Sequence, residues 1–204
     1  MTHAIERATT RSRELDLAIK AAAVATTVGA MTAVSVVDWM RIPLPFTPVP
    51  VTLQTLVVTA SALAIGARLS SLSMAIYLLL GLVGYPVFSG AEGGAHIVFG
   101  DTGGYLLGFV VAPWVVNRFA RADGKQPRLS AIVSGVLAGH LVIFALGLPV
   151  LWAALSASAG HLVTPDDVLL QGLVPFLPGL LIKTAIVSGM GPALVRIARS
   201  RDWR

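Results

Sequence analysis

The stretch LSAIVSGVLAGHLVIFALGL, which runs from Leu129 to Leu148, contains no Lys, Arg, Asp or Glu, and His140 is its only titratable side chain. An α-helix rises about 1.5 Å per residue, so these residues would span the roughly 30 Å hydrocarbon core of a bilayer. Length and composition together predict a transmembrane helix.

Other apolar segments lie on both sides of this one. They run from Ala18 to Val37, Leu53 to Gly66, Leu69 to Gly84, Gly103 to Val116 and Pro178 to Ile197. The second, third and fourth spans are shorter than the roughly 17 to 25 residues that a helix needs to cross alone. Their flanking loops are therefore expected to complete the crossing inside the protein. We expect an all-α, polytopic membrane protein with six transmembrane helices.

The composition also favours a membrane protein. The chain is 55% hydrophobic and 12% charged, whereas about 25% of the residues of an ordinary soluble domain are charged. Residues 18–198 are expected to form one transmembrane domain. An uncleaved cytoplasmic tail at residues 1–17 is expected to precede it, and a second tail at residues 199–204 to follow it.

The basic residues predict the orientation, because cytoplasmic loops carry an excess of Lys and Arg. With the N-terminus inside, six spans place almost all of them on the cytoplasmic side. These are Arg7, Arg11, Arg13, Lys20, Arg68, Arg118, Arg121, Lys125, Arg128, Arg196, Arg199, Arg201 and Arg204. Only Arg41 is expected outside, and only Lys183 within a span. Because the positive charges lie at the ends of apolar segments, the net charge of +5 does not indicate a nucleic-acid binder.

The three connections expected on the outer side are apolar and rich in structural signals. RIPLPFTPVPVTLQ contains Phe46 and four prolines that favour an extended, stiff segment. The second connection, YPVFSGAEGGAHIVFGDTGGY, is rich in glycine, which lets backbone approach a ligand closely. In the third, Thr164 as N-cap and Pro165 after it predict a short surface helix. Three structured outer loops suggest a lid over a pocket.

Lys183 is the most informative single residue, since a cation inside an apolar span is costly and usually has a function. If the last helix begins near Pro178, Lys183 lies about 8 Å from its outer end, within reach of an anion that arrives from outside. The alternative is a lysine whose ammonium extends to the outer headgroups.

Small residues recur every four positions along the first span, at Ala21, Ala25, Gly29 and Ala33. They form one flat stripe that lets another helix approach closely. The stripe either packs within this chain or docks a partner subunit, and the spacing alone does not choose between these alternatives.

Other polar and aromatic residues have a structural and a functional interpretation. The polar candidates near the outer boundary or at the ends of spans are Gln54, Glu92, His96, Asp101, Thr102 and Asn117, most of which are expected to be solvated or to cap helices. Tyr85, Phe88, Phe99 and Tyr105 are expected to form an interfacial belt unless they stack on a ligand. For His140, packing with a backbone hydrogen bond is at least as plausible as a proton relay.

Enzyme motifs are absent from the sequence. There is no G-x-x-x-x-G-K-[ST] loop for ATP, no H-E-x-x-H metal motif and no G-x-S-x-G nucleophile motif. The chain also has no cysteine, which excludes a disulfide and a thiolate nucleophile. We therefore expect no catalytic residue, no metal and no cofactor.

Four motifs stand in order along the chain. They are PFTPVPVTLQT (residues 45–55), YLLLGLVGYPVFSG (residues 77–90), GDTGGYLLGF (residues 100–109) and PFLPGLLIK (residues 175–183). Together they resemble the BioY family, the biotin-binding S components of energy-coupling factor transporters, over roughly residues 18–198. Family members usually carry Asp where this chain has Leu180, and commonly Pro where it has Asp101.

The resemblance implies an S-component fold that binds biotin from the outer side of a bacterial inner membrane. It also implies a partner module of a transmembrane scaffold subunit and two ATPase subunits, with the stripe of Ala21, Ala25, Gly29 and Ala33 on the scaffold. Biotin is expected to be the transported ligand. The residues expected to contact it are Lys183, Gln54, Tyr85, Phe88, Glu92, Asp101, Tyr105 and Phe46. A contact from Glu92, Gln54 or Asp101 could replace the one that Leu180 lacks.

Two other functions remain as alternatives. One is an S component for a different vitamin, which a panel of ligands would distinguish. The other is a small membrane enzyme that acts on lipids, which would need a metal cluster or a base and nucleophile pair that the sequence does not show.

Overall fold

A computed structural model describes residues 2–37, 40–120 and 128–201. Arg121, Lys125 and Arg204, which were expected on the cytoplasmic side, lie outside these residues. The elements in chain order are α1 (Thr2–Val36), β1 (Arg41–Leu44), β2 (Thr47–Thr52), α2 (Gln54–Leu82), α3 (Ala95–Val98), α4 (Gly103–Ala120), α5 (Leu129–Ala159), α6 (Pro165–Gly172), the short 3-10 helix η2 (Val174–Phe176) and α7 (Leu177–Ser200). The fold is thus mostly helical.

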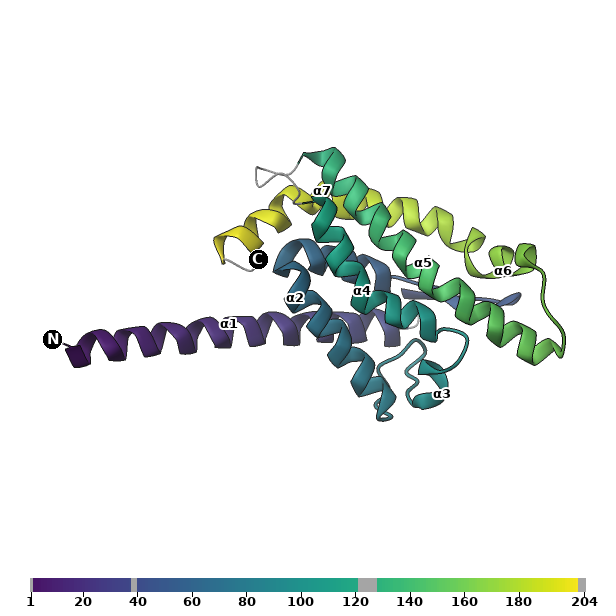
Figure 1. Cartoon of the computed structure of the whole chain (residues 1–204), viewed down its shortest axis with the longest axis horizontal. Helices are drawn as coiled ribbons and strands as arrows, with labels where there is room; N and C mark the ends of the chain where they lie inside the picture. Colours follow the sequence, from purple (N-terminus) through teal and green to yellow (C-terminus); the bar gives the residue numbers. More distant parts are fainter. Residues whose placement is uncertain (1, 38–39, 121–127, 202–204) are drawn as a thin grey trace.

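The long helices form one bundle around α2 and α4. Figure 1 shows α4 and α5 side by side, and the N-terminal half of α1 projecting beyond the other helices. The segment expected as a tail at residues 1–17 is helical from Thr2 and continuous with the first expected span. The helix predicted after Thr164 is present as α6, and the Thr164 hydroxyl accepts a hydrogen bond from the Asp167 backbone N–H at its N-terminus.

Within the described part of the chain, four helical segments are long and apolar enough to cross a membrane. They are Thr10–Val36, Gln54–Leu82, Leu129–Ala159 and Pro165–Ser200. The third and fourth contain the fifth and sixth expected spans, and the first contains the first expected span except for Val37. The second contains most of the expected second and third spans within a single element, α2 (Gln54–Leu82).

Helix α2 doubles back on itself at Gly66, whose φ of 81° and ψ of 169° are not helical. The hydroxyl oxygens of Ser61 and Ser70 lie 2.7 Å apart, whereas nine residues of straight helix would separate them by about 13 Å. Likewise, the Gln54 side-chain amide donates to the Tyr77 hydroxyl at 3.0 Å. The two halves of α2 are therefore antiparallel neighbours, and the turn between them lies where the sequence predicts one. The backbone at position 66 is in a region that only glycine adopts readily.

The expectation of an all-α fold is wrong at one place, because the proline-rich connection forms the antiparallel hairpin β1–β2. Arg41 pairs with Thr52 and Leu44 with Thr47, with an irregularity between Ile42 and Leu44. A hairpin of two strands has two free edges, and proline is tolerated where no ladder hydrogen bond is needed. Thr47 and Val49 are buried whereas Pro48 between them is exposed. The extended conformation was correctly predicted, but the pairing was not.

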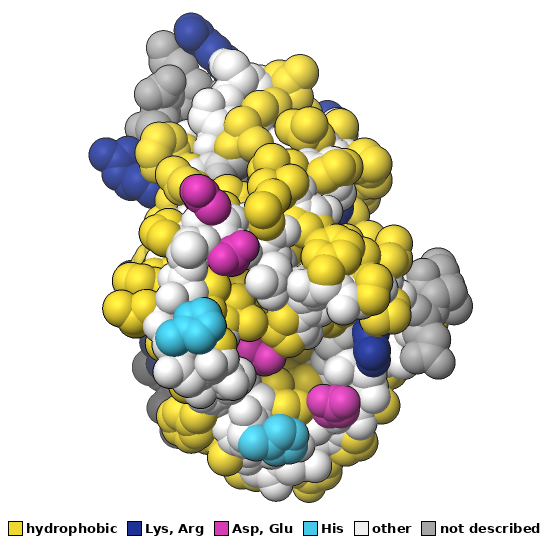
Figure 2. All heavy atoms as spheres, turned by 90° about the vertical axis from the view of Figure 1, so that its right-hand side faces the viewer, with side chains coloured by type: hydrophobic (Ala, Val, Ile, Leu, Met, Phe, Trp, Pro, Cys, Tyr) yellow, Lys and Arg dark blue, Asp and Glu magenta, His cyan; other side chains and the backbone are white. Residues whose placement is uncertain are grey.

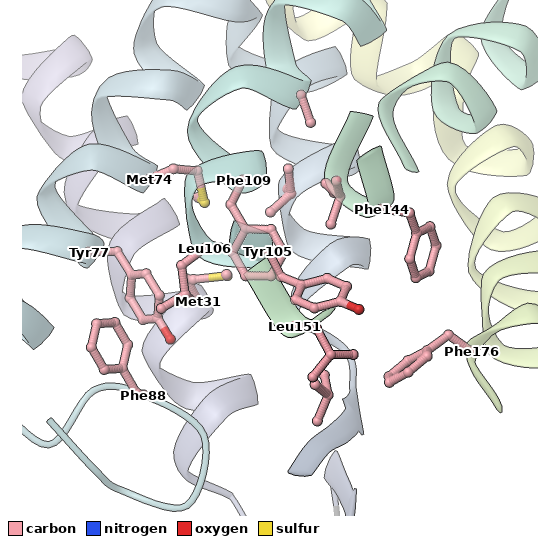
Figure 3. Packing of buried hydrophobic residues seen from close by; sticks show 14 of the residues in the cluster. Met31, Met74, Tyr77, Phe88, Tyr105, Leu106, Phe109, Phe144, Leu151 and Phe176 are labelled. Atoms are coloured by element: carbon pink, nitrogen blue, oxygen red, sulfur yellow. The ribbon is translucent and has the colours of Figure 1, made fainter. Parts of the chain in front are cut away.

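Buried hydrophobic side chains form two clusters. The larger cluster contains Tyr77, Phe88, Tyr105, Phe109 and Phe144 (Figure 3), and the smaller one contains Leu63, Val116, Ile132, Val136 and Val187. Buried polar residues stand between the clusters along three helices. These are Thr59 on α2, His140 on α5, and Lys183 with Thr184 on α7. The core is therefore interrupted by a polar layer.

Candidate functional site

A cavity of about 570 Å³ opens beside the larger hydrophobic cluster. The hairpin β1–β2, the loop before α4, and the helices α4, α5 and α7 all contribute to its wall. Figure 2 looks onto the end of the molecule at which α6 lies in Figure 1. It shows acidic and histidine side chains on this face, with hydrophobic side chains between them. The volume is typical of small-molecule sites.

Lys183 is one of the residues that line this cavity. The residue is 6% exposed, and its Nζ donates to the backbone oxygen of Thr52 at 3.1 Å. Among the described residues no carboxylate lies within 4.0 Å of Nζ. An ammonium has three donors, so two of them are left for a ligand. A buried cation without a counter-ion is costly, which favours a ligand that brings an anionic or strongly polar acceptor.

Gln54 connects the cavity wall to the helices behind it. Its amide nitrogen donates to the Ser35 hydroxyl and to the Tyr77 hydroxyl, each at 3.0 Å. Its amide oxygen accepts from the Thr52 hydroxyl at 2.8 Å. Gln54 was expected to contact the ligand, but its amide group is already engaged in these three hydrogen bonds. One of them joins it to Thr52, whose backbone oxygen accepts the hydrogen bond from Lys183.

Aromatic side chains form much of the apolar wall. Phe144 packs edge-on against Tyr105 and in a tilted arrangement against Phe176, with ring centroids 6.1 Å apart in both pairs (Figure 3). The Tyr105 hydroxyl donates to the Gly172 backbone oxygen at 2.9 Å, which fixes its ring toward α6. Phe88 packs edge-on against Tyr77. Buried aromatic pairs of this kind give a rigid wall.

Six of the eight side chains expected to contact a ligand line the cavity, namely Lys183, Gln54, Phe88, Glu92, Asp101 and Tyr105. Phe46 and Tyr85 are not among the lining residues, and they are 56% and 59% exposed. Phe46 lies in the turn of the β1–β2 hairpin, and Tyr85 lies in the loop after α2. Sequence order places both near the site but does not give the direction in which they point.

Several lining residues were not predicted as ligand contacts. Arg41 lines the cavity from β1. The sequence feature that could have indicated a role for Arg41 at the site was that it is the one basic residue expected on the outer side. Thr55, Ser89 and His140 also line it, and each has a buried polar atom without a hydrogen-bond partner in the described structure. By contrast, Asn117 donates to the Ala62 and Pro113 backbone oxygens and has a structural role.

The small-residue stripe of α1 lies on the surface. Ala21, Ala25, Gly29 and Ala33 are all exposed, whereas Met31 and Ser35 of the same helix are buried against the bundle. A Cβ at Gly29 would meet no atom within 4 Å. The alternative of close packing inside this chain therefore does not hold, because no described element covers the stripe.

A sequence model of the BioY family matches residues 7–200, nearly the whole chain. The chain belongs to the BioY family. The resemblance carried by the four ordered motifs is thereby confirmed.

Relatives across the BioY family are named biotin transporters. The chain is 44% identical over 124 residues to the biotin transporter BioY of Thermotoga maritima, covering 60% of this chain and 70% of that protein. It is 34% identical over 153 residues to the biotin transporter BioY2 of Lactococcus lactis subsp. cremoris, covering 75% and 80%. These names agree with the expectation that the chain is a transport protein and not an enzyme.

The fold of this BioY family chain is also similar to a solved structure. The crystal structure of the S-component for biotin from an ECF-type ABC transporter superposes with a TM-score of 0.74, covering 91% of this chain and 93% of that one. The two chains are 23% identical, so the comparison establishes the fold. The S-component-like fold expected from the motifs is therefore confirmed.

Proposed function

We propose that this chain is the biotin-binding membrane subunit of an energy-coupling factor transporter, which captures biotin from outside and mediates its uptake. The observation that carries the proposal is the buried Lys183 ammonium, with free donors, in an apolar and aromatic cavity. Biotin combines an aliphatic chain and ring with a carboxylate and a ureido oxygen, which suits few polar contacts in an apolar pocket. The names of the relatives support the same ligand.

Titration of the purified protein with a panel of vitamins tests this function. We expect saturable binding of biotin, and no saturation with thiamine or riboflavin at the same concentrations, because each site suits its own shape and donor pattern. Saturation by another vitamin in place of biotin would assign the chain to an S component of different specificity. Turnover of a lipid by the purified protein would favour the enzyme alternative and contradict the proposal.

The same proposal includes a six-span topology in a bacterial inner membrane with both termini cytoplasmic. The crossings would be α1, the two antiparallel halves of α2, and α4, α5 and α7. The distribution of Lys and Arg supports this orientation. The short halves of α2 are compatible with it because neighbouring elements can complete a crossing.

Reporter fusions test the topology. A reporter that is active only outside the membrane should be silent when fused after Arg201, and active when inserted between Gly160 and His161 in the exposed loop after α5. The insertion site lies beyond an odd number of crossings, and the fusion site beyond an even number. If only the fusion after Arg201 were active, the orientation would be the reverse of the proposed one. If both reporters were active, the two sites would lie on the same side, and the even number of spans would be contradicted.

The proposed partners are a transmembrane scaffold subunit and two ATPase subunits, which would supply the energy for release inward. The chain has no ATP-binding motif of its own, so an energised uptake needs another protein. The exposed stripe of Ala21, Ala25, Gly29 and Ala33 is the surface proposed to dock the scaffold, since small residues let a partner helix approach closely.

A further inference from the structure

His140 lies on the cavity wall at the level of the polar layer. It is 1% exposed, and it faces the cavity from α5 together with Ile143 and Phe144. Val136, one turn earlier, belongs to the smaller hydrophobic cluster, whereas Ile143 and Phe144 belong to the larger one. The imidazole is therefore a buried polar group at the apolar boundary of the site.

The protonation of the ring follows from its one partner. His140 Nδ1 lies 2.9 Å from the Val136 backbone oxygen, and a carbonyl oxygen only accepts hydrogen bonds, so Nδ1 carries a hydrogen. In a neutral imidazole the other nitrogen is then an acceptor. A second proton would add a cation to a cavity that already holds the Lys183 ammonium, and no described carboxylate lies within 4.0 Å of the ring. Nε2 is thus assigned as a bare acceptor.

Nε2 has no hydrogen-bond partner among the described residues, although the atom is buried. Buried polar atoms are nearly always paired, and an unpaired one needs an explanation. If the ring only filled space, a phenyl group would do so without this cost. An acceptor that has no partner among the described residues, on a side chain that lines the cavity, is suited to a donor on the ligand.

We propose that His140 is a ligand-recognition residue whose Nε2 accepts a hydrogen bond from an N–H group of the bound molecule. This rests on the proposed function, since biotin supplies such donors in the two N–H groups of its ureido ring. Lys183 offers only donors and His140 offers an acceptor, so the two residues recognise complementary groups. Together they select a molecule that carries an N–H donor as well as a polar or anionic acceptor.

The test uses two analogues of biotin in which one or the other ureido N–H is replaced by CH2. The replacement keeps the ring size and removes a single donor. Purified wild-type protein should bind biotin, and it should bind one of the two analogues about 5- to 150-fold more weakly, because His140 Nε2 then faces a group that cannot donate. Equal affinities for biotin and both analogues would overturn the inference and leave the proposed function intact. Absence of any biotin binding would instead overturn the proposed function, and the inference with it.

Variants assign the effect to His140. His140→Phe should weaken biotin binding and abolish the discrimination between biotin and the sensitive analogue, which a purely structural defect would not do. His140→Gln keeps an acceptor oxygen on a side chain of similar reach and should recover part of the discrimination. The matched control is His161→Phe, because His161 is exposed, contacts a backbone oxygen and does not line the cavity. Full discrimination retained in folded His140→Phe would overturn the assignment. If that variant does not fold, equal affinities of the wild type for biotin and both analogues would still overturn it.

Discussion

Lys183→Met is expected to weaken biotin binding by about 10- to 150-fold while the protein stays folded. Methionine keeps most of the length and apolar surface of the lysine stem but removes the ammonium. The variant therefore loses a charge-assisted hydrogen bond in a desolvated site. It also loses the bond to the Thr52 backbone oxygen, but it no longer buries an unpaired cation, so the free energy of unfolding should change little.

Calorimetric titration of purified wild type and Lys183→Met with biotin measures this effect directly. Lys20→Met is the matched control, since Lys20 is partly exposed on α1, pairs with Asp16 and lies outside the cavity. Size-exclusion profiles and unfolding temperatures of the three proteins show whether each is folded. Equal dissociation constants for wild type and Lys183→Met would show that the Lys183 ammonium does not contact the ligand and only anchors the β2 backbone.

A second ligand locates the contact. Biotin amide lacks the carboxylate charge, so wild type should bind it more weakly if Lys183 holds the carboxylate. In that case Lys183→Met should bind biotin and biotin amide about equally. If Lys183 instead donates to the ureido oxygen, the ratio of the two affinities should be the same in both proteins.

Ala25→Trp is expected to abolish module-dependent biotin uptake while biotin binding by the purified protein stays at the wild-type level. The indole would stand on the exposed small-residue stripe of α1 and hold a partner helix away. No residue of α1 is among those that line the cavity, and Ala25 lies more than two turns before Ser35, the α1 residue that bonds Gln54 of the cavity wall, so the ligand site should not change. Radiolabelled biotin uptake in cells that contain the coupling module measures the first effect, and titration measures the second.

Ala30→Trp is the control for this experiment. Ala30 is also exposed, but it is turned about 100° around the helix from Gly29, so its indole should face lipid. Uptake should therefore be retained in Ala30→Trp. Wild-type uptake by Ala25→Trp would exclude the stripe as the docking surface, and uptake that fails equally in both variants would show that any bulky residue on α1 disturbs the protein.

Lys183 was predictable from the sequence because the evidence for it is local. A single cation in an apolar run is visible without any tertiary information. The helical segments were predictable for the same reason, since length and apolar composition are read along the chain. The turn between the two halves of α2 likewise lies where the sequence separates two expected spans, the second ending at Gly66 and the third beginning at Leu69.

The cavity wall was only partly predictable, because it is assembled from elements that are distant in sequence. His140 and Arg41 acquire their place only when α5 and β1 meet α7 and the loop before α4. Sequence spacing gives the depth of a residue along a helix, but it does not give the direction of a loop side chain. For this reason Phe46 and Tyr85 were expected at the site, whereas the structure exposes them.

The β1–β2 hairpin was missed for a different reason. Four prolines in one short segment argue against regular strands within a sheet, and the sequence does not show that the segment pairs with itself. Leu180, where the resemblance to the family leads one to expect Asp, lines the cavity together with Asp101. Both positions at which the motifs were expected to differ from the family therefore lie in the cavity wall.

The atom that holds Lys183 belongs to the main chain of β2 and not to a side chain. Every amino acid has such an oxygen, so no substitution at position 52 can delete the acceptor as long as the strand keeps its path. A substitution at position 52 therefore leaves the acceptor of the Lys183 hydrogen bond in place. Side chains of the surrounding wall can therefore be exchanged while the acceptor that orients the ammonium group is retained.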